Sequence, residues 1–215
     1  GGGLMEEQDI NIPCPICTLS GQAKMIAHVD EIPYFGEHTQ VTILCHDCGW
    51  RQTDFIPAEG KKAGAWTLRV DEPSKLTARV VRSSSCTVHI PELDLQVNPG
   101  SNATGYVSNI EGVLKRFKEI VVMVLRDLQG DLEENLEAGI DSETMDQIAR
   151  LNQILQHMEG LDQDDASPLS IVLLDPHGHS MIMHPDAEER DLTPEELREL
   201  PVGPDPAVFS ADEMA

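Results

Sequence analysis

Four of the five cysteines form two pairs with the spacing that zinc sites use. Cys14 and Cys17 make the first Cys-x-x-Cys pair, and Cys45 and Cys48 make the second. Zn²⁺ takes four thiolates at tetrahedral corners, and each Cys-x-x-Cys turn supplies two of them. Four protein ligands leave no coordination position for water or a substrate. The spacing therefore predicts one structural zinc ion per chain, whose binding free energy, on the order of 10 kcal/mol, supports folding. The alternative is that one pair is a redox dithiol.

The other residues that could bind a metal ion lie late in the chain. His177, His179, His184 and Asp186 could supply ligands to a catalytic metal, so a metal-dependent enzyme on a cupin-like β scaffold is one alternative function. Against it, the first two histidines lie in a turn rich in Pro and Gly, and the chain has no Gly-x-Ser-x-Gly nucleophile motif. Cys86 lies in an alternating apolar stretch, which favours a small buried residue over a nucleophile. We therefore expect a protein that is not an enzyme.

The charge of the chain limits its partners. The 215 residues carry a formal net charge of −23. Nucleic acid affinity comes largely from Lys and Arg that neutralise phosphates, so a nucleic-acid-binding zinc ribbon is a disfavoured alternative. The acidity suits either a solvated surface in a salty cytoplasm or a docking surface for a basic protein. No apolar run is long enough to cross a bilayer and the N-terminus lacks the features of a signal peptide, so we expect a cytoplasmic protein.

Sequence patterns divide the chain into three parts. Residues 10–56 hold both cysteine pairs and two strand-like segments, as expected of a zinc ribbon. Residues 57–187 are rich in alternating apolar and polar residues and predict a β domain. Within them, Ser170 to Leu174 predicts a buried strand, with Ser180 to Met183 returning beside it. Residues 188–215 are acidic and Pro-rich, which predicts a mostly disordered tail with one short helix near residues 194–200.

A helical pattern interrupts the β domain at about residues 109–160. Apolar residues recur at three- and four-residue steps from Ile110 to Leu132, which is one face of a long helix. Gly139 breaks the pattern, and Ser142 offers an N-cap for a second helix that ends near Gly160. Two amphipathic helices joined by a short loop should pack as a hairpin. Its acidic tip would steer a basic partner by long-range attraction.

Several further motifs accompany the cysteines. They are Ile32-Pro33-Tyr34-Phe35-Gly36-Glu37, Cys48-Gly49-Trp50-Arg51, Ile90-Pro91-Glu92-Leu93-Asp94, Ile110-Glu111-Gly112-Val113-Leu114, and Asp175-Pro176-x-Gly178-x-Ser180. The order of these motifs resembles that of the ZPR-type zinc-finger family, in particular its archaeal single-module members. The resemblance extends from Cys14 to about Ala187. One departure is His179, because the family usually has Asn there.

The resemblance implies a fold and a function. The fold would be mainly β with an α insertion: a zinc ribbon followed by a double-stranded β-helix domain that carries the helical hairpin. The function would be binding of translation elongation factor 1-alpha, assisting its folding or biogenesis.

The loop around Tyr34 and Phe35, with Glu37, is a hypothetical partner contact, because exposed aromatic side chains anchor interfaces. Packing of both rings between ribbon and β domain is the alternative. Glu92 and Asp94 are a second hypothetical contact patch.

Overall fold

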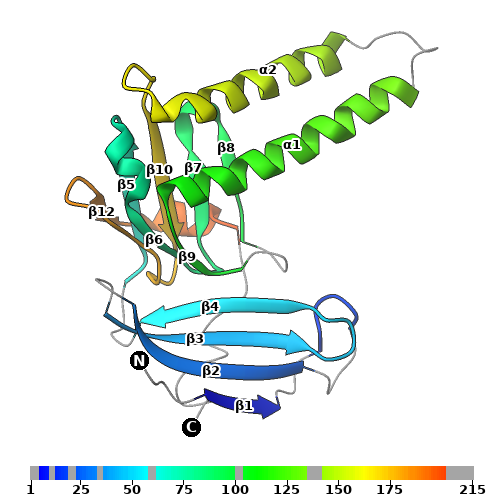
Figure 1. Cartoon of the computed structure of the whole chain (residues 1–215). Helices are drawn as coiled ribbons and strands as arrows, with labels where there is room; N and C mark the ends of the chain where they lie inside the picture. The colour runs from blue at the N-terminus through cyan, green and yellow to red at the C-terminus, as the bar shows by residue number, and fades with distance from the viewer. Residues whose placement is uncertain are drawn as a thin grey trace.

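A computed structural model describes residues 5–9, 13–18, 23–32, 36–57, 62–99, 104–134 and 142–201. They form a four-stranded N-terminal sheet, two further sheets, and a helical hairpin that projects from them (Figure 1). The predicted fold class is thereby confirmed: the chain is mainly β with a helical insertion. None of the described helices is both long enough and apolar enough to span a membrane.

The N-terminal sheet contains the cysteine pairs. Its strands lie in the order β1 (Met5–Asp9), β2 (Ala23–Ile32), β3 (Gly36–Cys45) and β4 (Arg51–Pro57), all antiparallel. Alternate side chains of β2 and β3 form a small core of Ala23, Met25, Val41 and Ile43. The first strand lies ahead of residue 10, where the sequence places the start of the ribbon. Its residues are mostly acidic or polar, and therefore gave no strand pattern.

Two sheets make up the larger β domain. The five-stranded sheet has the order β12-β5-β10-β7-β8, and the three-stranded sheet the order β11-β6-β9. The strands are β5 (Gly64–Val70), β6 (Arg79–Arg82), β7 (Thr87–Ile90), β8 (Leu95–Val97), β9 (Tyr106–Asn109), β10 (Leu169–Asp175), β11 (Met181–Met183) and β12 (Glu188–Asp191). Strand β10 is central, because it pairs with β5 on one side and β7 on the other. Its burial alternates strictly, with Leu169, Ile171 and Leu173 fully enclosed.

The strand after β10 differs from the prediction. Met181–Met183 does not return beside β10 but pairs with β6 in the other sheet. The Asp175 carboxylate explains the crossing, since it accepts hydrogen bonds from Ser83, just past β6, and from Ser180, just before β11. These bonds hold the turn against the end of β6, so the chain enters the second sheet.

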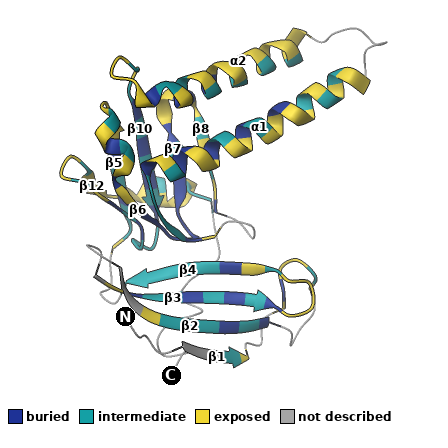
Figure 2. Cartoon of the chain, viewed as in Figure 1, coloured by how far each residue is buried: buried dark blue, intermediate teal, exposed yellow. Residues whose placement is uncertain are grey.

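The helical insertion agrees with the pattern of apolar residues. Helix α1 (Ile110–Glu134) and helix α2 (Ser142–Glu159) form the hairpin. The side chain of Asn109 caps α1 by accepting the Gly112 N–H at 2.8 Å. Core residues of α1 extend from Ile110 to Leu125, and beyond them the hairpin projects past the strands, where most side chains are exposed (Figure 2).

The prediction of disorder from residue 188 onward is wrong for residues 188–201. Strand β12 pairs with the edge of β5, and Leu192 beyond it is buried. Helix α3 (Pro194–Glu199) follows, where a short helix was predicted, and starts with a Thr193–Glu196 capping box. The sequence did not predict strand β12 because its residues are charged and show no apolar alternation. Such a strand can still form, since pairing with a free sheet edge uses backbone groups rather than apolar side chains. Residues 202–215 lie outside the described residues.

Candidate metal centre

The four predicted ligands meet at one end of the N-terminal sheet. The sulfur atoms of Cys14, Cys17, Cys45 and Cys48 all lie within 4.8 Å of one another. Two sulfur pairs, Cys14 with Cys48 and Cys17 with Cys45, are separated by 3.6 Å. Tetrahedral zinc with bonds of about 2.3 Å separates its sulfur ligands by about 3.8 Å. The cluster therefore has the donor type, number and spacing that fit a tetrahedral metal ion.

Both cysteine turns have the same backbone design. In the first, the N–H of Thr18 donates to the carbonyl of Cys14, and in the second the N–H of Gly49 donates to that of Cys45, both at 2.9 Å. The residue after each second cysteine is left-handed, with φ of 63° at Thr18 and 80° at Gly49. Glycine suits this conformation, whereas a β-branched residue is strained there. The sequence indicated the glycine but gave no signal for Thr18.

The site favours thiolate at Cys14, whereas the pKa of Cys48 is raised: the hydrogen bond from the Trp50 N–H acts to lower it, but burial and the thiols of Cys14 and Cys45 outweigh that bond. Burial acts to raise the pKa of Cys14, but hydrogen bonds from the N–H groups of Cys17 and Ile16 and from the thiols of Cys48 and Cys17 outweigh it. They lower this pKa from 9.0 to about 7. Metal ligation requires thiolate, so the local backbone prepares the site for a cation. Exposure differs between the ligands: Cys14 and Cys45 are buried, whereas Cys48 is exposed.

The histidines considered for a catalytic metal do not assemble into a site. The rings of His177 and His179 lie 5.9 Å apart, and His184 accepts the N–H of Asp186 through Nδ1. Among the described residues, the four cysteines are the one group whose ligand atoms converge as a metal site requires. Cys86 is fully buried, and burial raises the pKa of its thiol to about 12, so it is a packing residue.

Asp175 holds the turn that contains the first two histidines. Its carboxylate is buried and accepts the N–H groups of His177 and His179, as well as the hydroxyls of Ser83, Ser85 and Ser180. The two backbone bonds mean that Asp175 caps its own turn. The three serines could not be assigned from sequence, because two of them come from a different strand connection.

A polar joint attaches the N-terminal sheet to the larger β domain. Asp54 of β4 accepts the N–H of Ser84 at 3.1 Å and its hydroxyl at 2.6 Å. The neighbouring Thr53 N–H donates to Thr104 Oγ1 at 2.9 Å, and the Gly105 N–H donates to the Thr53 carbonyl. Desolvation raises the pKa of Asp54, although the bonds from Ser84 and Phe55 act to lower it. Sequence spacing gave no signal for this contact.

Comparison with known proteins places the fold in a family. The ZPR1 jelly-roll domain family matches residues 74–199. An uncharacterized ZPR1-like protein from Pyrococcus horikoshii is 38% identical over 191 residues, which is 89% of this chain and 80% of that protein. A second such protein, from Methanocaldococcus jannaschii, is 32% identical over 192 residues, which is 89% of each chain. This chain belongs to the ZPR1 family.

A eukaryotic relative of this ZPR1 family member carries a more informative name. The zinc finger chaperone zpr1 of Schizosaccharomyces pombe is 28% identical over 191 residues, which is 86% of this chain but only 38% of that protein. Relatives are thus named for zinc and for chaperone action, and four clustered cysteines could bind a metal ion here. The larger β domain is the ZPR1 jelly roll.

The hypothetical partner contacts of this ZPR1 chain are spread over two regions. Tyr34 and Phe35 lie outside the described residues, so their role as contact or core stays a prediction. Glu37 is exposed in β3. Glu92 is exposed, but its carboxylate accepts the N–H and the hydroxyl of Ser170, both at 2.8 Å. Asp94 is exposed and left-handed, with φ of 51°.

Proposed function

We propose that this chain binds one Zn²⁺ through Cys14, Cys17, Cys45 and Cys48, and that it binds translation elongation factor 1-alpha in the cytoplasm to assist its folding. The partner is what the family resemblance of the sequence motifs implies, and the name of the fission yeast relative supports the chaperone action. Four thiols that fill a tetrahedral site support a structural ion. A closed site of this kind leaves the metal no catalytic position, so we propose binding without catalysis.

The observation that carries a protein-binding function is the projecting hairpin. Its two helices expose Met123, Val124 and Met145, with exposed fractions of 57%, 39% and 45%. Such side chains contribute nothing to the jelly-roll core, whereas flexible apolar side chains on a projecting element suit a variable or partly folded partner. A client that exposes apolar surface while it folds has the matching chemistry.

Charge gives the same hairpin a second role. Acidic residues gather toward the tip of the hairpin, in a chain of net charge −23: Asp127, Asp131, Glu133 and Glu134 lie in the last turns of α1, and Glu143 and Asp146 in the first turns of α2. Long-range attraction would speed the encounter with a basic client, whereas the apolar side chains would determine how long it stays. Association with a basic client should therefore slow as salt is raised, because salt screens charges over about 8–10 Å at physiological strength.

The central experiment uses the purified elongation factor and the full chain in titration calorimetry. We expect binding, and we expect the double variant Met123→Ser/Val124→Ser to weaken it by about tenfold, the effect of losing two partly buried apolar contacts at an interface. Gln129→Ser, an exposed polar change on the same helix, is the matched control and should bind as the unmodified chain does. Failure of the elongation factor to bind the intact, metal-loaded chain would contradict the proposal.

The loop hypothesis has its own variants. Tyr34→Ala/Phe35→Ala should reduce binding without changing the melting temperature if these rings are partner contacts. A lowered melting temperature would instead mean that the rings are core. Glu37→Gln and Asp94→Asn remove single exposed charges, so each should change affinity less than loss of both rings. Glu92→Gln is a weaker probe of binding, because the same carboxylate holds Ser170.

A further inference from the structure

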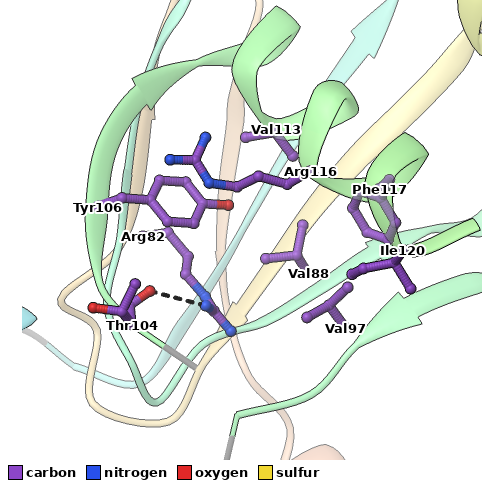
Figure 3. A pocket seen from close by; sticks show the side chains of 9 residues that line it. All are labelled: Arg82, Val88, Val97, Thr104, Tyr106, Val113, Arg116, Phe117 and Ile120. Atoms are coloured by element: carbon purple, nitrogen blue, oxygen red, sulfur yellow. Dashed lines mark hydrogen bonds between the residues drawn. The ribbon is translucent and has the colours of Figure 1, made fainter. Parts of the chain in front are cut away.

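A pocket opens between the first half of α1 and the strands beneath it. Its volume is about 180 Å³, and Figure 3 shows the side chains that line it. Strands β6 to β9 and helix α1 contribute all but one of them: Arg82, Val88, Val97, Thr104, Tyr106, Val113, Arg116, Phe117 and Ile120. The cysteine cluster contributes no residue, and neither do Met123, Val124 and Met145.

The base of the pocket is apolar. Val88, Val113 and Phe117 are almost fully buried, whereas Ile120 is 39% exposed at the mouth. Most ligand and cofactor pockets hold about 300–1,000 Å³, so this volume fits a single side chain rather than a nucleotide or a drug-sized molecule. We call this apolar base, formed by Val88, Val113 and Phe117, the cup. An apolar pocket of this size commonly binds one anchoring side chain of a partner protein.

Two guanidinium groups flank one aromatic ring at the side of this cup. The Arg116 guanidinium carbon lies 3.9 Å from the centre of the Tyr106 ring, and that of Arg82 lies 5.8 Å from it. In Figure 3 the ring lies between the two arginines. Both distances are within the range of cation–π attraction, so the ring helps to hold two like charges near each other.

The two arginines differ in their hydrogen bonds. Arg82 is buried and donates to the carbonyls of Cys86 and Thr104 through all three of its nitrogen atoms. Exposed Arg116 donates through only one nitrogen, to Ser108 and to the carbonyl of Gly112. Among the described residues, no carboxylate forms a salt bridge with either one. The pocket therefore carries two positive charges without a neighbouring acidic partner, in a chain of net charge −23.

The Tyr106 hydroxyl adds a neutral donor. Burial raises the pKa of Tyr106, although Arg82 and Arg116 act to lower it. The hydroxyl thus stays protonated at neutral pH. No described residue accepts a hydrogen bond from it, so it can donate to a carboxylate held by Arg116.

From this arrangement we propose that the pocket binds a short segment of a partner protein in which an aromatic or large aliphatic residue is followed by Asp or Glu. The apolar side chain fills the cup formed by Val88, Val113 and Phe117. The carboxylate that follows it pairs with the free edge of Arg116 and with the Tyr106 hydroxyl. Arg82 adds positive charge from below.

The positive charge of Arg82 and Arg116 is the reason why we expect an acidic residue in the bound segment. The chain as a whole repels a carboxylate through its net charge of −23, so local pairing with the two cations of the pocket favours one register of the bound segment. The inference goes beyond the proposed function, because the pocket and the exposed hairpin residues Met123, Val124 and Met145 share no side chain. Each can therefore fail without the other.

The test uses two small probes with the full, metal-loaded chain. They are acetyl-Phe-Asp-amide and acetyl-Phe-Asn-amide, which match in shape and differ in charge. Binding is followed by ¹H–¹⁵N NMR, including the side-chain Nε signals of the arginines. We expect shifts at Tyr106 and Arg116, and an affinity for the Asp probe about tenfold above that for the Asn probe, the usual effect of one charge-assisted hydrogen bond.

Two variants on α1 separate recognition from structure. Arg116→Gln should bind both probes equally, because it removes the charge that discriminates between them while the apolar cup remains. Lys115→Gln, an equally exposed neighbour outside the pocket, should keep the tenfold preference. Lys115→Gln should leave the melting temperature unchanged, whereas Arg116→Gln should lower it slightly, because that variant loses the contact with the Tyr106 ring.

Three results would overturn the proposal. They are equal affinity for the two probes, an unchanged preference in Arg116→Gln, and an absence of shifts at Tyr106 at the highest soluble probe concentration. The chain itself contains Phe209, with Asp212 three residues after it, so it offers both side-chain types for the same pocket at a wider spacing. If Phe209→Ser in the full chain raises probe affinity by tenfold or more, the occupant is the chain itself rather than a partner.

Discussion

The N-terminal sheet and the jelly roll of this ZPR1 family member are held together by different means. The hydrophobic core of the sheet is a small cluster of Ala23, Met25, Val41 and Ile43, with Trp50 and Ile56 packed against it. The jelly roll instead buries apolar residues from both of its sheets and from both long helices in one continuous core. A core as small as the first cannot offset the ordering entropy of a β-sheet, so such units depend on a metal or a disulfide.

This contrast explains why the cysteines and the apolar residues occupy separate parts of the chain. Structural zinc supplies roughly 10 kcal/mol to a unit with little core, whereas the jelly roll needs no such ion. The N-terminal sheet and the jelly roll should therefore each be sensitive to a different perturbation. Metal removal should affect the first, and core truncation should affect the second.

Loss of the metal site should give the largest effect. Cys45→Ser, or removal of the ion with a strong chelator, should unfold the sheet β1–β4 while the jelly roll stays folded. Amide NMR signals of Met25 and Val41 would lose their dispersion, while those of Leu173 would keep it. Cys86→Ala is the control, because Cys86 is buried in the jelly roll and its loss should leave the metal content unchanged. Unfolding of both parts together would contradict the contrast.

Truncation in the jelly-roll core should give the next largest effect. Leu173→Ala empties a fully buried position on the central strand β10 and should cost about 2–5 kcal/mol. Urea unfolding followed by near-UV circular dichroism measures the cost, and metal content per chain should stay constant. Met25→Ala is the counterpart in the N-terminal sheet. If that variant fails to fold even with excess metal, packing matters there more than the comparison implies.

The polar joint between the two parts should give a smaller effect. Asp54→Ala removes both hydrogen bonds to Ser84 and should weaken the attachment of the sheet by about 1–3 kcal/mol. Hydrogen exchange at the Ser84 and Gly105 amides should then quicken, with the metal retained. Slow exchange at both amides in this variant would mean that Thr53 and Thr104 hold the joint without Asp54.

Asp54→Asn tests the charge at the same position. Folding raises the pKa of Asp54 above its unfolded value of 3.8. The carboxyl therefore lowers the free energy of unfolding progressively as pH rises from the unfolded pKa through the folded pKa. An amide keeps the shape and does not ionise, so this variant should remove that pH dependence. It should also protect the two amides at neutral pH at least as well as the original residue.

Substitutions in the two cysteine turns should have the smallest effect. Gly49→Ala adds a side chain to a left-handed residue and should weaken metal binding by about 1 kcal/mol, measured by competition with a chelator. No atom lies within 4 Å of the added Cβ, so the backbone conformation alone would cause the loss. Thr18→Ala is the matched control, because that position already carries a Cβ at positive φ. Equal losses in both variants would contradict this explanation.

Local patterns predicted much of the fold and one site. The two Cys-x-x-Cys spacings predicted the cluster of four cysteines that could hold a metal ion, because a tight turn places its two sulfurs close together. Apolar steps from Ile110 onward located α1, and Ser142 marked the start of α2. These predictions succeeded because each pattern depends on residues only a few positions apart in the chain. Strand β1 and strand β12 were missed, since both add to a sheet edge through backbone bonds that carry no sequence pattern.

By itself, then, the sequence determined which four cysteines cluster, the helical hairpin and the mainly β class, because helix periodicity and cysteine spacing are local properties of the chain. Only the tertiary structure decided that Asp54 meets Ser84, that β11 joins β6, and that Tyr106 lies between Arg82 and Arg116. Those contacts bring together residues from separate elements. Their partners are selected by how two sheets and a helix pack, and no short-range pattern encodes that packing.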